Sequence, residues 1–439
     1  MTFAATQVVH IAPKRNACPV VATLLTPLLA IVAFPVPLFL ITLTVMLFRP
    51  PEIEFYSLDR IALVILIFAV LVRTIVRQQR LELYRLTWPL FGLMTMAVAS
   101  ALSHPFEARI WSVTAAKFIV PFVFFHIAGL IFEDERDLRW LERFAMIVLA
   151  YLTFIALAFW IGAQECVFPR FILDPDLGIH TERARGPFLQ AVANGVTLNL
   201  LGLLAIDRYR VGCLRRAGPF VLLTSLPLAI LATKTRSVWL SFAISAGWVL
   251  FGSAEFRRNR GVRWLLVALG GVVLVAMLNG MPNALEERLQ DSSPVEFRMA
   301  AYRAGWSMFL EKPLSGWGAS QLQSELADRI DGFKGESFVV HNTYFEILLE
   351  HGLLGFVLYL WVVIELVRAG RRKEALSAHG FVGSLQRLWP ILVGIYLVNA
   401  TFVVMNYQFV NGLLFAFAGI LAAQQRHSSE TEDAGAPAH

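Results

Sequence analysis

Charged residues and cysteines are both scarce in this chain, and each scarcity excludes a class of protein. Only 16% of the 439 residues are charged. The three cysteines, Cys18, Cys166 and Cys213, lie far apart and show neither metal nor redox spacing, so no disulfide framework is expected. The sequence also has no Walker-type phosphate loop and no His/Cys cluster suited to zinc.

Long apolar runs fill most of the chain instead. Hydrophobic residues make up 57% of it, and most runs approach the ~20 residues needed to cross a ~30 Å hydrocarbon core. The clear runs are Ile61–Val76, Leu86–Leu102, Val113–Phe132, Phe144–Gly162, Phe188–Ile206, Pro219–Ala232, Val238–Phe251, Trp264–Leu278, Phe345–Val367, Leu388–Val404 and Phe409–Ala422. The sequence therefore predicts an all-α integral membrane protein with one membrane domain.

Basic residues predict how these runs are oriented. Clusters of arginine and lysine lie within residues 73–85, 208–216, 257–263 and 368–373, and an even number of clear runs separates successive clusters. All four can therefore be cytoplasmic, as the positive-inside rule requires. The first apolar region, Cys18–Phe48, contains three prolines and can be one broken span, two short spans or a re-entrant pair. Counted as one broken span, it gives about twelve spans.

The remaining connections then share the outer face. They are Arg49–Arg60, His104–Trp111, Ala163–Pro187, Thr233–Ser237, Met281–Tyr344 and Met405–Gln408. The fifth is the only long polar stretch inside the chain, and it ends at His341, where a helical pattern begins. Nearly all the unusual polar sequence thus collects on one face, which predicts a functional site there.

Arginines recur in three of these outer connections, where the positive-inside rule disfavours them. They are Arg183, Arg185, Arg236, Arg298 and Arg303. Arginines at span ends commonly snorkel to lipid headgroups. A group of guanidinium side chains at an outer surface also suits a lipid diphosphate, because planar forks bind phosphate oxygens bidentately. His341 shares their face and can accept a proton near pH 7, although lone histidines are more often packing residues.

Two further features have competing interpretations. Asp174 and Asp176 resemble a metal-binding acidic pair, but a turn built on Pro175 explains them better. Lys117 lies near the outer end of an apolar run, where it either reaches the same site or snorkels to the surface.

Four segments resemble the O-antigen ligase and polymerase superfamily of bacterial membrane glycosyltransferases. They are RARGPF with Asn194 following it, TKTRSVWL, RMAAYRAGWSMFLEKPLSGWG and HNTYFEILLEHGLLG. The chain departs from the family pattern at Thr235, where serine is usual, and at Phe345, where leucine is usual. The last two segments, occurring in that order, are the ones most specific to this superfamily.

The resemblance implies roles for particular residues. His341 is similar to the family's essential histidine, and Arg236 to the arginine of its Thr-x-Ser-Arg element. Arg298 resembles the arginine that opens the long-loop helix, with Arg303 as a competing candidate. Arg183 and Arg185 both lie near the remaining arginine position, and the sequence does not choose between them.

The resemblance also implies an architecture and an activity. The expected fold resembles the GT-C type, with helices in residues 1–280, a long periplasmic loop at 281–344, helices at 345–425 and a disordered cytoplasmic tail at 426–439. The expected donor is O-antigen on undecaprenyl diphosphate and the expected acceptor is lipid A-core oligosaccharide. The site would face the periplasm from the bacterial inner membrane, in contact with membrane lipids. No metal, cofactor or nucleic acid is expected, and the oligomeric state stays open, with a monomer compatible.

Other functions remain open from the sequence. Members of the superfamily also polymerise O-antigen repeats or transfer glycans to proteins such as pilin. The compact single long loop favours the ligase. A transporter that binds an anionic lipid or solute with its arginines is the non-enzymatic alternative, but it would be expected to show inverted repeats and polar residues at mid-membrane. Neither feature is seen in the sequence.

Overall fold

The structure, a computed structural model, describes residues 34–49, 58–79, 81–178, 180–211, 217–251, 293–330, 340–370 and 380–435. This part of the chain is helical and contains no strand. Its long helices are α2 (Pro35–Leu47), α3 (Leu58–Val76), α4 (Thr87–Leu102), α7 (Glu135–Trp160), α8 (Ala191–Arg210), α9 (Ala217–Ala232), α10 (Arg236–Phe251), α14 (Ser293–Glu311), α15 (Gly318–Arg329), α16 (Thr343–Ala369), α17 (Phe381–Ala400) and α18 (Gln408–Gly435). Helix α5 (Ala108–Thr114) and α6 (Val120–Ile131) are joined by a π-helical turn, Ala115–Ile119. Short 3-10 turns occur at Gln164–Cys166, Arg170–Leu173 and Gly186–Phe188 (η4).

Four of the described helical segments are long and apolar enough to cross a membrane. They are Ala108–Ile131, Glu135–Trp160, Thr343–Ala369 and Phe381–Ala400, and three further apolar helices are shorter. Large apolar side chains on several helices are exposed, such as Ile75 at 74% and Trp248 at 72%. Apolar surface of this kind suits a lipid environment. The prediction of an all-α integral membrane protein is confirmed at this level.

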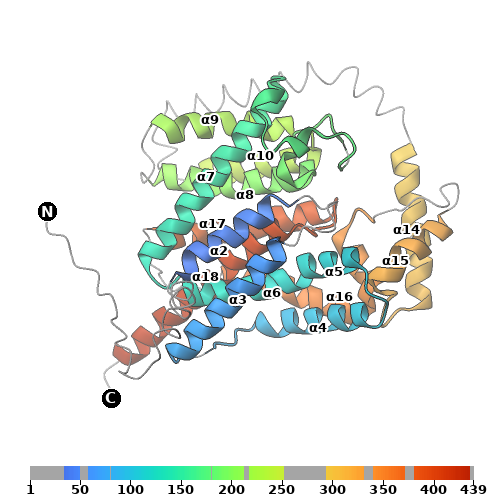
Figure 1. The fold of residues 1–439 in the computed structure, drawn as a ribbon, viewed down its shortest axis with the longest axis horizontal. Coiled ribbons are helices and arrows are strands. Elements are labelled where there is room, and N and C mark those ends of the chain that lie inside the picture. The colour runs from blue at the N-terminus through green and yellow to red at the C-terminus, as the bar shows by residue number, and fades with distance from the viewer. Residues whose placement is uncertain are drawn as a thin grey trace, which may run out of the picture.

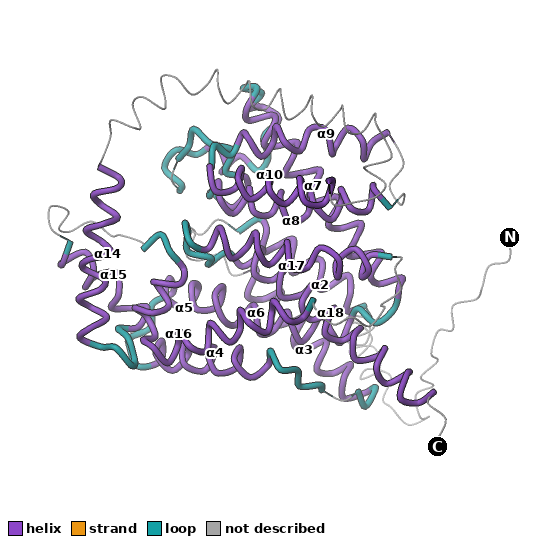
Figure 2. Tube along the Cα trace, turned by 180° about the vertical axis from the view of Figure 1, so that it is seen from behind, coloured by secondary structure: helices purple, strands orange, loops and turns teal. Residues whose placement is uncertain are grey.

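The helices form two groups that meet at α17 (Figure 1). Helices α7 to α10 lie together in one group, and α2 to α6 with α16 and α18 lie in the other (Figure 2). Helices α14 and α15 lie at one end, where α15 contacts α4, α5 and α16.

Close backbone packing holds the second group together. Helix α18 packs along α6, and a Cβ at Gly419 would collide with the backbone carbonyl of Phe125. Lipid chains are as apolar as these side chains, so helices in membranes associate through close packing and interhelical hydrogen bonds. Small residues in α18 therefore serve helix association.

Buried polar side chains join helices within the first group and connect that group to α17. Asn199 of α8 and Asn399 of α17 each donate to Ser241 Oγ of α10 at 3.2 Å. Elsewhere on α8, Arg208 forms an ion pair with Glu142 of α7, with Nε and Oε1 2.5 Å apart. These contacts give α8, which is buried along nearly its whole length, polar partners in α7 and α10.

Most predicted apolar runs correspond to a described helix, with ends shifted by several residues. The run Trp264–Leu278, the first part of Cys18–Phe48 and the residues 281–292 and 331–339 of the long polar stretch lie outside the described residues. Helix α18 differs from the prediction, because it continues to Gly435 through residues expected to form a disordered tail from 426 onward.

Candidate active site

The connection between α7 and α8 is built around Arg185. This side chain is 1% exposed, and its guanidinium donates hydrogen bonds to the carbonyls of Leu177 at 2.5 Å, Ile172 at 2.7 Å and Asp174 at 2.9 Å. Several carbonyls on one buried guanidinium compensate for the removal of its charge from water. Arg185 therefore holds the loop, which leaves Arg183 as the better candidate to meet a ligand.

Arg183 lies two residues earlier and is half-buried. Its Nε is 3.1 Å from Glu182 Oε1, and its backbone N–H donates to the His180 carbonyl at 3.1 Å. Such an ion pair with a half-exposed carboxylate is weak and exchanges easily with solvent or ligand. The loop therefore fixes the backbone of Arg183, while its side chain can exchange its weak ion pair for a ligand.

Two of the sequence elements are joined by backbone hydrogen bonds. The Ala184 N–H, within the arginine-glycine element, donates to the carbonyl of Ala232 at 3.0 Å, directly before the segment TKTRSVWL. Asn194 completes the joint by donating to the Ala184 carbonyl at 2.9 Å. Arg236 begins α10 just beyond this joint, and its side chain is exposed. The structure therefore brings the Arg183 and Arg236 elements together.

The third and fourth elements interlock at a break in α16. The backbone of Gly352 has φ 63° and ψ −164°, which interrupts the helix. Leu353 N–H donates instead to the Pro313 carbonyl at 2.8 Å, while Trp317 N–H donates to Leu349 O at 2.9 Å. Only glycine adopts this backbone conformation readily, and a Cβ at Gly352 would also collide with Leu314. The segment PLSGWG after α14 is therefore fixed against the first half of α16.

His341 directly precedes that half-helix. Asn342 caps it, with its Oδ1 accepting hydrogen bonds from the N–H groups of Tyr344 at 3.0 Å and Phe345 at 3.1 Å. Burial lowers the pKa of His341, and the positive charges of Arg298 and His180 lower it further. A neutral imidazole, the form able to accept a proton, is therefore favoured at pH 7.

These interactions distinguish the two arginines of α14. Both Arg298 and Arg303 are exposed, but Arg298 is the one whose charge acts on His341. His180, which the sequence analysis did not single out, acts from the loop that carries Arg183. From the sequence, His180 could have been noticed only as a histidine that lies in a predicted outer connection. The charge of Arg298 thus acts on His341, and so does that of His180 from the loop that carries Arg183.

Lys117 is paired within the protein. Its Nζ lies 2.8 Å from Glu346 Oε1 and 2.9 Å from Glu350 Oε1, and all three side chains are at most 8% exposed. The two glutamates are one turn apart on the first half of α16, so both face the π-helical turn that carries Lys117. Snorkelling of Lys117 to the surface, one of the two interpretations of the sequence, is therefore wrong. The pairing with Glu346 and Glu350 was not foreseen.

The DPD segment forms a turn. Asp176 N–H donates to Asp174 Oδ1 at 2.9 Å, in the manner of an Asx turn. Asp174 also offers its backbone carbonyl to Arg185. Among the described residues there is no group of three or more His, Cys, Asp or Glu side chains able to hold a metal ion.

Comparison with known proteins connects this site to a family. Residues 220–360 match a protein-family model described as O-antigen ligase, a match that covers about a third of the chain. The matched part includes Arg236, Arg298, Arg303 and His341 but neither Arg183 nor Lys117. A search of curated proteins finds no match. The resemblance seen in the sequence is therefore confirmed over residues 220–360, the part of the chain that matches the O-antigen ligase model.

Proposed function

We propose that this protein transfers O-antigen polysaccharide from undecaprenyl diphosphate to a sugar hydroxyl of lipid A-core oligosaccharide. The observation that carries the proposal is the half-buried His341, whose pKa is lowered by burial and by the positive charge of Arg298. One group accepts a proton and the other binds an anion, and glycan transfer from a lipid diphosphate requires both. The match to the O-antigen ligase model over the same residues supports it.

The proposed step balances as a single displacement. The acceptor hydroxyl oxygen forms a bond to the anomeric carbon of the donor, and its proton goes to His341. The bond between that carbon and the phosphate oxygen breaks, and the diphosphate leaves with the electron pair. Attack from the face opposite the leaving group inverts the anomeric configuration.

Arginine charges stabilise the departing diphosphate in this proposal. Arg298, Arg236 and Arg183 neutralise the charge that develops on the phosphate oxygens, which is the electrostatic effect that dominates phosphate chemistry elsewhere. A leaving group stabilised in this way needs neither a metal nor a separate general acid. Arg303 is a weaker candidate, because Arg298 is the α14 arginine whose charge lowers the pKa of His341.

The finer architecture is part of the same proposal. About twelve spans, one long periplasmic loop and a site open to the periplasm from the inner membrane follow from the charge pattern. Four of the six connections predicted on the outer face line one cavity, which supports a shared face for them.

Complementation of a ligase-deficient Gram-negative strain tests the proposal. The host must make core and O-antigen from the same source as this chain, since a mismatched acceptor gives a false negative. We expect wild type to restore the lipopolysaccharide ladder, and His341→Ala to abolish it while lipid-linked O-antigen accumulates. His104→Ala, in another outer connection, is the matched control and should retain the ladder.

Two results would overturn parts of the proposal. A ladder that persists with His341→Ala would exclude the general-base role. The absence of a ladder with wild type in the matched host would direct attention to O-antigen polymerisation or to glycan transfer to protein.

A further inference from the structure

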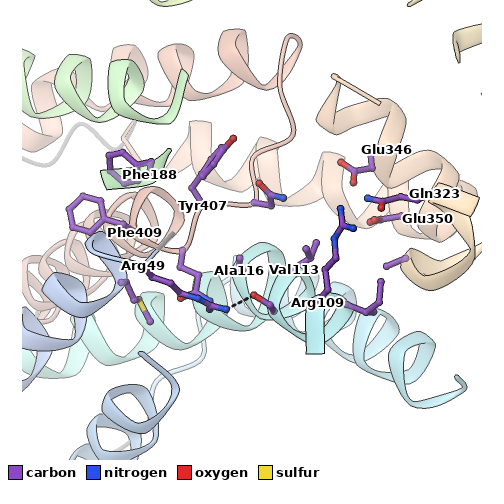
Figure 3. A pocket seen from close by; sticks show the side chains of 16 residues that line it. Arg49, Arg109, Val113, Ala116, Phe188, Gln323, Glu346, Glu350, Tyr407 and Phe409 are labelled. Atoms are coloured by element: carbon purple, nitrogen blue, oxygen red, sulfur yellow. Dashed lines mark hydrogen bonds between the residues drawn. The ribbon is translucent and has the colours of Figure 1, made fainter. Parts of the chain in front are cut away.

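A cavity of about 430 Å³ lies beside the first half of α16 (Figure 3), and Arg183, Arg236 and Arg298 are not among its lining residues. Its size falls in the range of ~300–1,000 Å³ typical of small-molecule sites. Connections from distant parts of the chain contribute Arg49, Arg109, Gln323 and Tyr407 to its wall, and Phe188 comes directly after the loop that holds Arg183. His341 is not among the lining residues.

One end of the cavity is polar and rich in hydrogen-bond acceptors. Glu346 and Glu350 line it together with Gln323 and Arg109, as Figure 3 shows. Lys117 holds both glutamates, but Glu346 Oε2 has no hydrogen-bond partner among the described residues. The Oε1 of Gln408, another lining residue, also lacks a partner within the described part of the chain. Buried acceptors of this kind require a donor, such as a hydroxyl group.

The other end of the cavity is aromatic. Phe188, Tyr407 and Phe409 line it, and Figure 3 shows their rings gathered at the end opposite the glutamates. Flat apolar walls with a few convergent polar groups are typical of small-molecule sites. A sugar ring combines the two matching properties, because its C–H face is apolar and its rim carries hydroxyl donors and acceptors.

The charged groups of this cavity do not favour a diphosphate as its ligand. Lys117 at the polar end is already paired with Glu346 and Glu350, so its charge is not available to a diphosphate. The guanidinium of Arg49 is already bonded to Asp59 Oδ2 at 2.5 Å and to Ser112 Oγ at 2.8 Å. A diphosphate therefore gains little here, whereas a hydroxyl-rich ligand meets acceptors and a stacking surface.

We infer that this cavity binds a sugar residue of the acceptor oligosaccharide. The inference rests on the proposed transferase function. Glu346 and Glu350 stand on the same half-helix that begins after His341, so a sugar held there shares a rigid element with the base. Gln323 and Tyr407 are specificity-determining residues that contact the sugar, and Lys117 is a positioning residue that orients the two glutamates.

Steady-state kinetics of the full chain in lipid nanodiscs tests the inference. Gln323→Ala and Tyr407→Ala are compared with wild type while acceptor is varied at saturating donor, and then the reverse. We expect the KM for acceptor to rise about tenfold for each variant, corresponding to ~1.4 kcal/mol of lost binding. The KM for donor and kcat should stay within about twofold of the wild-type values. Each substitution removes a contact that is equally strong in the ground state and in the transition state, and losing such a contact raises only the KM for acceptor.

Gln321→Ala provides the matched control. Gln321 lies on the same helix, α15, but does not line the cavity, so its KM values should equal those of wild type. Thermal unfolding midpoints of all three variants establish that each is folded. A rise in the donor KM, or no change in either KM for folded variants, would overturn the acceptor assignment.

Direct binding separates failure of this inference from failure of the proposed function. Delipidated core oligosaccharide is titrated into wild type, Gln323→Ala and Gln321→Ala without donor. Weaker binding by Gln323→Ala alone would support the cavity even if no transfer were detected with any lipid-linked glycan. Equal binding by all three proteins would overturn the cavity assignment while leaving the transfer reaction untouched.

Discussion

The arginines of the outer connections and the Lys117 cluster use charge in opposite ways. Arg236, Arg298 and Arg303 are exposed and have no ion-pair partner within the described residues. Lys117 is 4% exposed and lies within 3 Å of two carboxylates. An exposed guanidinium keeps its hydration and remains available to an anion, whereas a buried ammonium must be paired. The comparison supports the proposal that the exposed arginines bind the ligand, whereas the buried lysine organises the helices.

Lys117→Met should have the largest effect on stability. It leaves Glu346 and Glu350 as buried carboxylates without a counter-charge, and breaking a buried pair of this kind costs about 3–5 kcal/mol. The measurement is the unfolding midpoint of the purified protein in one detergent. Lys117→Met combined with Glu346→Gln and Glu350→Gln should recover most of the loss. An unchanged midpoint for Lys117→Met alone would contradict the structural role of the cluster.

Arg298→Ala and Arg236→Ala should lower activity and leave stability nearly unchanged. In the proposed reaction each removes a charge that stabilises the departing diphosphate, so we expect transfer to fall ~10²–10³-fold, as when one electrostatic donor is removed elsewhere. The unfolding midpoint should hardly move, because neither side chain is buried. Arg303→Ala, on the same helix as Arg298, is the matched control with a smaller expected loss. Equal losses for the two α14 arginines would remove the distinction between them.

Arg185→Gln and Arg183→Gln compare a buried and a more exposed arginine within one loop. The first substitution leaves three carbonyls without the guanidinium and should lower the free energy of unfolding by about 1–3 kcal/mol. The second should leave stability within ~0.5 kcal/mol and lower transfer activity. Chemical unfolding and the transfer assay on the same preparations measure both effects. The opposite pattern would make Arg185 the ligand-binding residue.

The smallest expected effect is a shift in pH dependence. A general base loses activity as pH falls through its pKa, and in wild type burial and nearby positive charge hold the pKa of His341 below its ordinary value. Arg298→Gln removes one of these charges, so the pKa of His341 rises and the acid limb of the pH–rate profile moves to higher pH. Arg303→Gln should leave the limb in place. An acid limb that moves to lower pH with Arg298→Gln would reject the assignment.

Much of the site could be predicted from the sequence, since its parts lie in short contiguous segments. His341, Arg236 and Arg298 each stand in a recognisable pattern, and their predicted common face agrees with the loop contacts. The choice between Arg183 and Arg185 could not be predicted, because it depends on carbonyls in the segment Ile172–Leu177 that the loop folds back to present. Local sequence does not reveal that the loop folds back and brings these carbonyls to Arg185.

The sequence by itself determined the membrane class and the order of helices, and it predicted which residues gather in the outer connections. These properties are local, because hydropathy and charge are read along the chain and the bilayer acts on each segment separately. Only the tertiary structure decided that Lys117 pairs with Glu346 and Glu350, and that α16 breaks at Gly352 against the segment after α14. Those outcomes depend on which distant segments pack together, since a buried charge and a broken helix are both stabilised by partners far away in the sequence.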